Sequence, residues 1–476
     1  MILLSLSKPA NSYTIADKHF KEANSPIFVV NGFANFSAAY ANQGAAFERS
    51  ILVDGISDNN LRHSTAIGND TQLLLKAGMK TDEEVKFGAV AKVEMNINTN
   101  RFNQKPKLDQ AFLYSQGEFG KFEFGNHKPA NQSMKAGTQK LARGTGGING
   151  KYLEYVNLPM LANSTQSTSP ACSGASCNNV KLPQFILLAQ SPIGHGGYAK
   201  SFYISPNGSS EGATYSAYQR SNFRAFKDDS FEGMEDSTKI SYFSPSFEGL
   251  KFGVSYTPTT NNIGITKQTA YDIADIRIEN IFSFAANYEN DFDNLNLEIS
   301  LTGEKGQIKN AKSTYGVNRG DLFAYDIGAN LSYFGFTVGA SYGSWGSSLM
   351  PKNGIYYCDY NSSQNLAAQN CANSAQKFSD PHYYTAGISY QFGPIAASLT
   401  GIKTTFQKND YKAFSLGLDY KLSRDLMPYF EVTKFAFESN EIVAADVVNQ
   451  ASIPNAQKQL RDNQGYVFLT GILYSF

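Results

Sequence analysis

The chain has 476 residues, with 41 Lys and Arg against 41 Asp and Glu, so its formal net charge is zero. This balance indicates no broad basic surface, and we expect no nucleic-acid partner. No apolar run approaches the roughly 18 residues of a transmembrane helix, which excludes such a helix. A membrane β-barrel is still compatible with this composition, because its strands alternate lipid-facing and lumen-facing residues.

The first residues are a poor secretion signal. Met1-Ile-Leu-Leu-Ser-Leu-Ser7 has a very short apolar core and no preceding basic residue. A signal peptide needs a longer apolar core with a basic residue before it. We expect the true signal to lie upstream, or this segment to be its remnant. Residues 1–25 are predicted to carry little ordered structure, and 26–476 to form one domain.

Apolar and polar residues alternate with a period of two along most of the chain. In 323–333, for example, Phe323, Tyr325, Ile327, Ala329, Leu331 and Tyr333 alternate with mainly small or polar residues. Such a period is typical of strands with one apolar and one polar face. It predicts about sixteen strands, mostly near the roughly 9–11 residues that cross a bilayer. These lie near 27–40, 70–80, 85–98, 108–118, 121–127, 237–245, 249–258, 276–289, 294–304, 321–334, 335–346, 380–392, 394–404, 410–422, 425–437 and 463–476.

The connections between these segments alternate between short and long. Outer-membrane barrels have short periplasmic turns opposite longer extracellular loops, which is the pattern seen here. An even strand count also brings both chain ends to the periplasmic side, where the first and last strands can close the barrel. The long connections are 41–69, 128–236, 259–275, 305–320, 347–379 and 438–462, with 99–107 and 405–409 as shorter ones on the same side.

The four cysteines form two local pairs in polar segments. Neither pair has His or carboxylates at the spacing of a zinc site, and we expect no metal and no other cofactor. Two loop-closing disulfides, Cys172–Cys177 and Cys358–Cys371, are the preferred interpretation and imply an oxidising compartment. Four free thiols in loops are the alternative.

The last predicted strand ends in an aromatic residue. Phe476 is terminal, and Tyr474, Ile472 and Phe468 share its face. An amphipathic final strand with an aromatic terminus is typical of the signal that the barrel-assembly machinery reads. The alternative is a strand that simply ends in Phe.

Three segments resemble the Gram-negative general porins. Residues 30–37 (VNGFANFS) are similar to the opening strand of that family, 110–125 to its fourth-to-fifth-strand hairpin, and 238–256 to its next hairpin. The resemblance implies an all-β, transmembrane antiparallel barrel of about sixteen strands. It also implies a homotrimer, with the loop after the fifth strand folded into or over the pore as a constriction.

The chain departs from the family pattern in this loop. Where the family commonly has Arg after the glycine that ends the fifth strand, Asn126 stands here, and the loop of 128–236 is unusually long. Its 181–205 part contains an apolar run that could form an additional hairpin. If that hairpin joined the wall, the barrel would have eighteen strands.

Residue parity predicts which charges face the lumen. Opposite charges across a pore create a transverse field that aligns dipolar solutes, whereas scattered, solvated charges are the alternative. Glu94 and Glu123 interrupt the basic side. The first half of the wall is predicted to be basic through Lys76, Lys86, Lys92, Lys121, Lys239 and Lys251, and the second half acidic through Glu298, Asp326, Asp419 and Glu431.

The start of the long loop is also basic. Lys128, Lys135, Lys140 and Arg143 precede Lys151, against the single acid Glu154. If the loop folds inward, these cations are expected to line its narrowest point and favour anions. A solvated extracellular loop is the alternative.

The predicted function is an outer-membrane porin for passive diffusion of small hydrophilic solutes and ions. No enzyme is predicted, because the five histidines lie in unrelated loops or strand ends and no catalytic motif surrounds them. The alternatives are a substrate-specific channel or a barrel-anchored surface adhesin or antigen. The expected partners besides the solutes are outer-membrane lipid, two further copies of the chain and the barrel-assembly machinery.

Overall fold

A computed structural model describes most of the predicted strands and part of the long loop. The described residues are 24–44, 64–95, 107–156, 185–194, 237–260, 262–263, 266–267, 276–310, 320–348, 379–407, 409–438 and 462–476. The predictions for residues 1–23 and for all four cysteines lie outside these ranges, so both disulfides stay a prediction.

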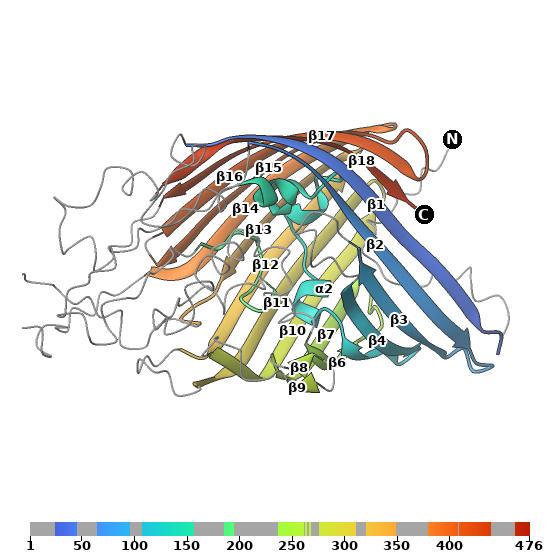
Figure 1. Cartoon of the computed structure of the whole chain (residues 1–476). Coiled ribbons are helices and arrows are strands. Elements are labelled where there is room, and N and C mark those ends of the chain that lie inside the picture. Colours follow the sequence, from blue (N-terminus) through green and yellow to red (C-terminus); the bar gives the residue numbers. More distant parts are fainter. Residues whose placement is uncertain are drawn as a thin grey trace, which may run out of the picture.

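Sixteen antiparallel strands form one closed barrel in which each strand pairs with its neighbour along the chain (Figure 1). The last strand pairs with the first, with Phe33 opposite Ser475, and leaves no open edge. Closure satisfies every strand's backbone hydrogen-bonding groups, as a lipid environment requires. The wall strands are β1 (Ile27–Asn42), β2 (Thr65–Lys80), β3 (Lys86–Glu94), β4 (Lys107–Gly117), β5 (Gly120–Asn126), β6 (Thr238–Phe243), β7 (Leu250–Thr259), β10 (Ile276–Phe292), β11 (Leu295–Asn310), β12 (Leu322–Tyr333), β13 (Phe336–Ser344), β14 (Ser379–Phe392), β15 (Ile395–Gln407), β16 (Asn409–Tyr420), β17 (Leu426–Glu438) and β18 (Asn463–Ser475).

The sixteen-stranded prediction is confirmed, and the eighteen-stranded alternative is wrong. β5 pairs directly with β6, with Asn126 opposite Thr238, so no hairpin from the intervening loop enters the wall. The described part of the proposed hairpin, 185–194, contains no strand. β8 (Asn262–Ile263) and β9 (Thr266–Lys267) form a separate two-stranded sheet.

The tight turns lie at one end of the barrel, together with the C-terminus (Figure 1). Several contain residues with positive φ, such as Phe334 and Gly335 between β12 and β13 at 44° and 84°. Positive φ at both central residues is typical of the two-residue turns that match strand twist. By the rule for outer-membrane barrels, this end is periplasmic and the long connections lie at the outer end.

The outer surface of the barrel is apolar and has an aromatic band at each end. On β12, Ile327 and Leu331 are exposed between the exposed rings of Tyr325 and Tyr333. Their neighbours on the other face, such as Asp326, are buried inside the barrel. An apolar belt between aromatic girdles is the surface that a bilayer covers.

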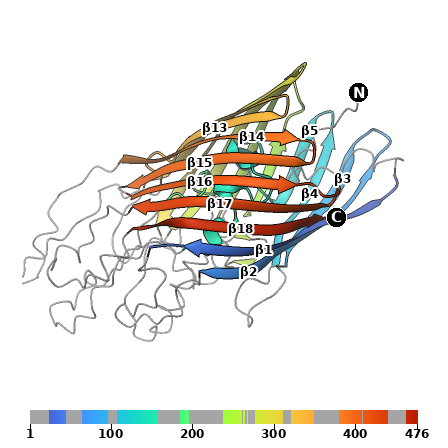
Figure 2. The ribbon, with the colours of Figure 1, turned by 90° about the horizontal axis from the view of Figure 1, so that it is seen from above.

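The only helices among the described residues are short and belong to the loop after β5. They are α2 (Ala130–Ser133) and the 3-10 helices η3 (Thr138–Lys140), η4 (Gly147–Asn149) and η5 (Lys151–Tyr155). None of the described helices is long and apolar enough to cross a membrane. In both views they lie within the ring of strands (Figures 1 and 2).

A charge on the apolar belt is expected to destabilise the barrel, while the same charge one residue away is not. Ile388 of β14 is exposed on the outer face, and Ser389 faces the lumen. Ile388→Arg is expected to lower the free energy of unfolding in lipid vesicles by about 2–4 kcal/mol, the cost of Arg near the bilayer midplane. Equal losses for Ile388→Arg and the control Ser389→Arg in urea titrations would contradict the assignment of faces.

Candidate functional site

Residues 127–156, which follow β5, run along the inner surface of the wall. The backbone N–H of Ala130 donates to Ser255 Oγ of β7 at 2.9 Å. Further along, the N–H of Ala136 donates to Ser300 Oγ of β11 at 2.8 Å. Both serines are buried and face the lumen, so the first part of the loop is attached to the wall by its own backbone.

Glycines on the lumen face make room for this backbone. A Cβ on Gly328 of β12 would overlap the carbonyl oxygen of Ala136, and one on Gly253 of β7 would overlap Met134. Glycine in a strand commonly marks such a close backbone approach. The depth at which the loop lies is therefore set in part by where the strands have no side chain.

A buried ion pair attaches the next part of the loop. Lys135 Nζ lies 3.0 Å from Asp326 Oδ2 of β12 and donates to the Ala189 carbonyl at 2.5 Å. Tyr383 of β14 donates to the same carboxylate oxygen at 2.7 Å. Burial lowers the pKa of Lys135, and Asp326 opposes that shift by favouring the charged ammonium.

Two more wall carboxylates hold the tip of the loop. Arg143 forms a salt bridge with Asp419 of β16, in which Nε donates to Oδ1 at 2.9 Å. The N–H of Thr145 donates to Glu431 Oε1 of β17 at 2.8 Å, and its hydroxyl donates to the other oxygen. These contacts use the acidic half of the wall that the sequence predicts.

Residues 127–156 make a first pass inside the barrel, and residues 185–194 make a second one. Ala189 lies against the first pass, where its N–H donates to Asn149 Oδ1 at 3.1 Å. Trp345 Nε1 donates to the Gln190 carbonyl at 2.8 Å. Glu304 of β11 joins the two passes, because it accepts from Ile193 N–H at 3.0 Å and from Asn131 Nδ2 at 2.8 Å.

An apolar core forms between the two passes and the inner wall. The ring of Phe185 packs edge-on against Phe437 of β17, with ring centroids 5.1 Å apart. A porin lumen is ordinarily polar, so apolar residues on the lumen face of these strands indicate permanent coverage. The buried core includes Ile148, Tyr152, Leu153, Val156, Phe185, Ile186, Leu187 and Ile193 from the loop, and Trp345, Tyr383, Ile402, Phe406, Tyr411, Phe435, Phe437, Val467 and Leu469 from or beside the wall.

The first pass ends at β1 and β2. Lys151 Nζ lies 3.3 Å from Asp70 Oδ2 of β2, and the hydroxyl of Tyr155 is 3.2 Å from that of Ser37 of β1. Together these contacts carry the described part of the loop along the lumen face from β6 and β7, past β10–β18, to β1 and β2. The lumen face of β3–β5 receives no comparable contact from α2, η3, η4 or η5.

Several of the predicted basic residues lie on β2–β5, and some form ion pairs with neighbours. Lys121 Nζ is 2.5 Å from Glu123 Oε1 on β5. Lys92 Nζ of β3 is 2.5 Å from Asp109 Oδ2 of β4 and 4.0 Å from Glu94 Oε1. Lys76 and Lys86 share the same lumen face by parity, with Lys76 deeply buried.

The remaining predicted residues are dispersed. Lys251 lies 4.0 Å from Glu289, and Glu298 accepts hydrogen bonds from Asn287 and Asn330. Lys239 donates to the His127 carbonyl at 2.5 Å. Lys128 is half-buried at the start of the loop, and Lys140 lies in η3, with its side chain outside the described part.

His127 and Ser241 form a buried contact that the sequence did not indicate. His127 Nε2 is 2.7 Å from Ser241 Oγ and 3.6 Å from Glu123 Oε2. Both partners face the same ring nitrogen, whereas a hydrolytic triad uses the two nitrogens separately. Burial, with a further effect of the nearby Lys239 ammonium, lowers the pKa of His127 to about 3, so the ring is neutral at ordinary pH.

The anchoring residues other than ions were missed by sequence analysis. Asn131, Thr145, Ser255 and Ser300 hold the loop through hydrogen bonds. The only signal for the two serines is a small polar residue at a lumen-facing position of a strand, a feature that most lumen positions share. No group of three or more His, Cys, Asp or Glu able to hold a metal occurs among the described residues.

The comparisons with known proteins decide the family. The family profile for Gram-negative porins matches residues 23–440. The chain belongs to the Gram-negative porin family. It is an outer-membrane β-barrel that forms a porin channel.

Related sequences and a solved structure match this porin over most of its length. It is 25% identical over 461 residues to an uncharacterised protein of Rickettsia felis, and 25% identical over 458 residues to one of Rickettsia typhi, with 85% of each chain covered in both cases. An anion-selective porin from Comamonas acidovorans has the same fold, with a TM-score of 0.53 at 12% identity over 95% of this chain and all of that one.

Removing the carboxylate of Asp326 is expected to detach part of the loop. Asp326→Ala leaves the Lys135 ammonium buried without its counter-charge, which is expected to lower the free energy of unfolding by about 3–5 kcal/mol. Trypsin should then cut the folded variant after Lys135. The double variant Lys135→Met/Asp326→Leu is expected to regain most of the loss, and Asp425→Ala in an exposed turn to change stability by less than about 0.5 kcal/mol. Protection from trypsin in Asp326→Ala would show that the ion pair does not hold the loop.

Proposed function

We propose that this porin passes small hydrophilic solutes and ions by passive diffusion along the β3–β5 side of its lumen. The supporting observation is where the described residues of the loop attach to the inner wall. Loop residues attach to β7, β10–β12 and β14–β17, while β3–β5 keep their charged side chains facing inward. Passive diffusion needs only a hydrated lumen lined by fixed charges.

We also propose a modest preference for anions. The acidic half of the wall contributes little field to the passage, because Asp326, Asp419 and Glu431 are each bound to the loop and less than 10% exposed. On the other side, Lys76, Lys86, Lys92 and Lys121 exceed Glu94, Asp109 and Glu123 by one charge. Lys76 and Lys92 are also less than 10% exposed, so the proposed preference rests on the partly exposed Lys86 and Lys121. Lys135 and Arg143, expected from sequence at the narrowest point, act in this proposal as anchors.

The porin proposal is tested by single-channel recording in planar bilayers, with reversal potentials under a potassium chloride gradient. Stepwise openings with a small anion preference are expected. Lys86→Gln/Lys121→Gln is expected to shift the reversal potential toward cations, whereas Lys305→Gln on the outer surface of β11 leaves it unchanged. Insertion without conductance would favour the adhesin, and cation preference in the unmodified protein would overturn the role of the lysines. Saturation of the current by one solute class would favour a substrate-specific channel.

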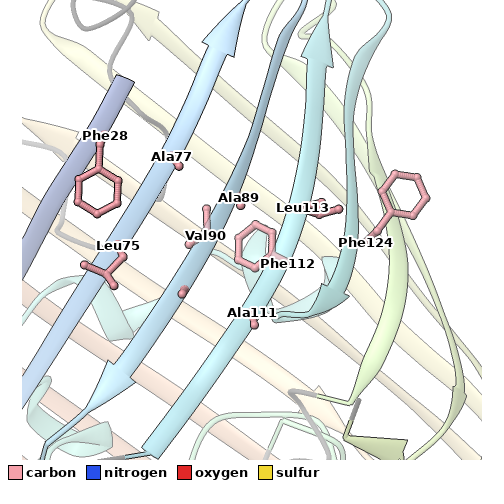
Figure 3. Close-up of a pocket in the computed structure, with 10 residues that line it drawn as sticks. Phe28, Leu75, Ala77, Ala89, Val90, Ala111, Phe112, Leu113 and Phe124 are labelled. Atoms are coloured by element: carbon pink, nitrogen blue, oxygen red, sulfur yellow. The ribbon is translucent and has the colours of Figure 1, made fainter. Parts of the chain in front are cut away.

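The proposal includes a homotrimer, which is supported by a groove in the membrane-facing surface (Figure 3). Its volume is about 470 Å³, and alanines in its lining keep this part of the wall low between larger residues. An apolar hollow on a lipid-facing wall suits the side chains of a second copy. It is lined by Phe28, Leu75, Ala77, Ala89, Val90, Ala91, Ala111, Phe112, Leu113 and Phe124.

Filling the groove is expected to weaken the trimer. Ala91→Trp places a large ring in the hollow, so the fraction of trimer on gels run without heating should fall. Ala340→Trp, on the exposed outer face of β13, is the matched control and is expected to leave the trimer intact. A full trimer with Ala91→Trp would place the subunit contact elsewhere on the wall.

The last strand supports recognition by the barrel-assembly machinery, which completes the proposal. Tyr474 and Phe476 are about half-exposed on the outer face, and their rings stack at 6.0 Å. Their exposure leaves both rings accessible on the last strand, and outer-membrane lipid is expected to cover them afterwards. The two loop disulfides remain part of this proposal on the sequence pattern alone.

A further inference from the structure

Three lysines lie together on the membrane-facing surface near the outer end of β15–β17. Lys403, Lys412 and Lys434 alternate with buried, lumen-facing residues, so they point away from the lumen. Lys403 is directly opposite Lys412. Lys434 is opposite Phe414, the next outward residue of β16 after Lys412. We call these three residues the lysine patch; its strands lie side by side (Figure 2).

The lysine patch lies at the outer boundary of the apolar belt. On β16, Tyr420 marks the inner girdle, and Leu418, Leu416 and Phe414 are exposed between it and Lys412. This distance matches the roughly 9–11 residues with which a strand crosses the hydrocarbon. The ammonium groups are therefore at the level of the outer-leaflet headgroups.

Aromatic residues of the outer girdle flank the patch on both sides. Tyr384 of β14 is opposite Lys403, and Tyr466 of β18 is opposite Lys434. The Lys434 ammonium lies 5.7 Å from the centre of the Tyr466 ring. On three consecutive strands, lysines therefore occupy the positions of the girdle aromatics. They place positive charge on a surface that lipid covers.

The charges of the patch are only partly balanced by the protein. Lys412 Nζ is 3.2 Å from Glu438 Oε1. Asp410 lies opposite Glu438, two residues from Lys412 toward the outer end of β16. Its carboxylate accepts a hydrogen bond from Thr405 Oγ1 at 2.8 Å. Among the described residues, Lys403 and Lys434 have no ion-pair partner, so the patch retains excess positive charge toward the membrane.

We propose that the lysine patch binds the phosphate of a phosphorylated lipid headgroup in the outer leaflet. Lysine is a compact cation with three donors and binds phosphate as a point charge. Clusters of basic residues at a membrane surface attract anionic headgroups. Exposed Phe414 and Leu416, directly below the patch, provide the apolar surface that the acyl chains of the same lipid cover.

The test uses the full chain, folded into phosphatidylcholine vesicles that contain a minor fraction of diphosphorylated lipid A. Native mass spectrometry after gentle extraction measures how much lipid A each barrel retains. The unmodified protein is expected to enrich lipid A over phosphatidylcholine. Lys403→Gln/Lys434→Gln is expected to reduce the retention constant by about fivefold per lysine.

The matched control is Lys305→Gln. Lys305 is also exposed on the outer face near the outer end of a strand, but it stands opposite Phe282 and Phe323 instead of other lysines. Retention unchanged by this control but reduced by the double variant supports the patch. Equal loss in both would indicate general charge attraction, and no loss in the double variant would overturn the site.

Two further measurements separate the phosphate of the lipid from other sources. Lipid A without phosphates is expected to show no enrichment, and enrichment there would overturn the role of phosphate. Inorganic phosphate at the same concentration as lipid A is expected to leave retention unchanged; displacement would indicate a site for free phosphate. Shifted gel mobility on heating confirms that each variant is folded.

Discussion

The need to pair every backbone N–H and C=O within the membrane governs this structure. A sheet satisfies these groups in lipid only if it has no edge, and the pairing of β1 with β18 removes the edge. Closure in turn gives each strand one face toward lipid and one toward the lumen. The alternation of Tyr325, Ile327 and Leu331 with Asp326 and Asn330 on β12 follows from that division.

Inside the barrel, a second constraint acts on the charges. Carboxylates in a confined lumen are costly unless partners replace the lost water, and Asp326, Asp419 and Glu431 each find that partner in the loop after β5. The same contacts determine where the loop lies, so wall and loop stabilise each other. In the proposed function, the passage for solutes lies along β3–β5, to which none of the helices α2, η3, η4 and η5 is attached.

The strands were predictable because their period of two is a local signal. β12 and β16 were placed to within two residues at each end. β2 begins at Thr65, whereas the sequence predicted a start near residue 70. The alternation did not reveal the first five residues, because Ile67 is the only large apolar residue among them. Parity predicted that Asp326 faces the lumen, and Lys135 was placed in the long connection after the fifth strand, but neither assignment indicated that the two residues meet.

The path of the loop was not predictable, because it depends on contacts between distant residues without periodic pattern. Ala136 and Ser300 meet by backbone and side chain, and neither residue type is distinctive. Residues 185–188 suggested a strand because a short apolar run does not distinguish a strand from buried irregular chain. All four residues are apolar because the lumen wall and the first pass of the loop enclose them.

The pairing of the two terminal strands has a consequence for biogenesis. Gly32 and Phe476 exchange both backbone hydrogen bonds, at 2.9 and 3.0 Å, although nearly the whole chain separates them. The ring cannot close while the ribosome still holds the C-terminus, so folding follows translation and export. Until β1 and β18 pair, each has an unpaired edge, and such an edge is able to pair with another chain.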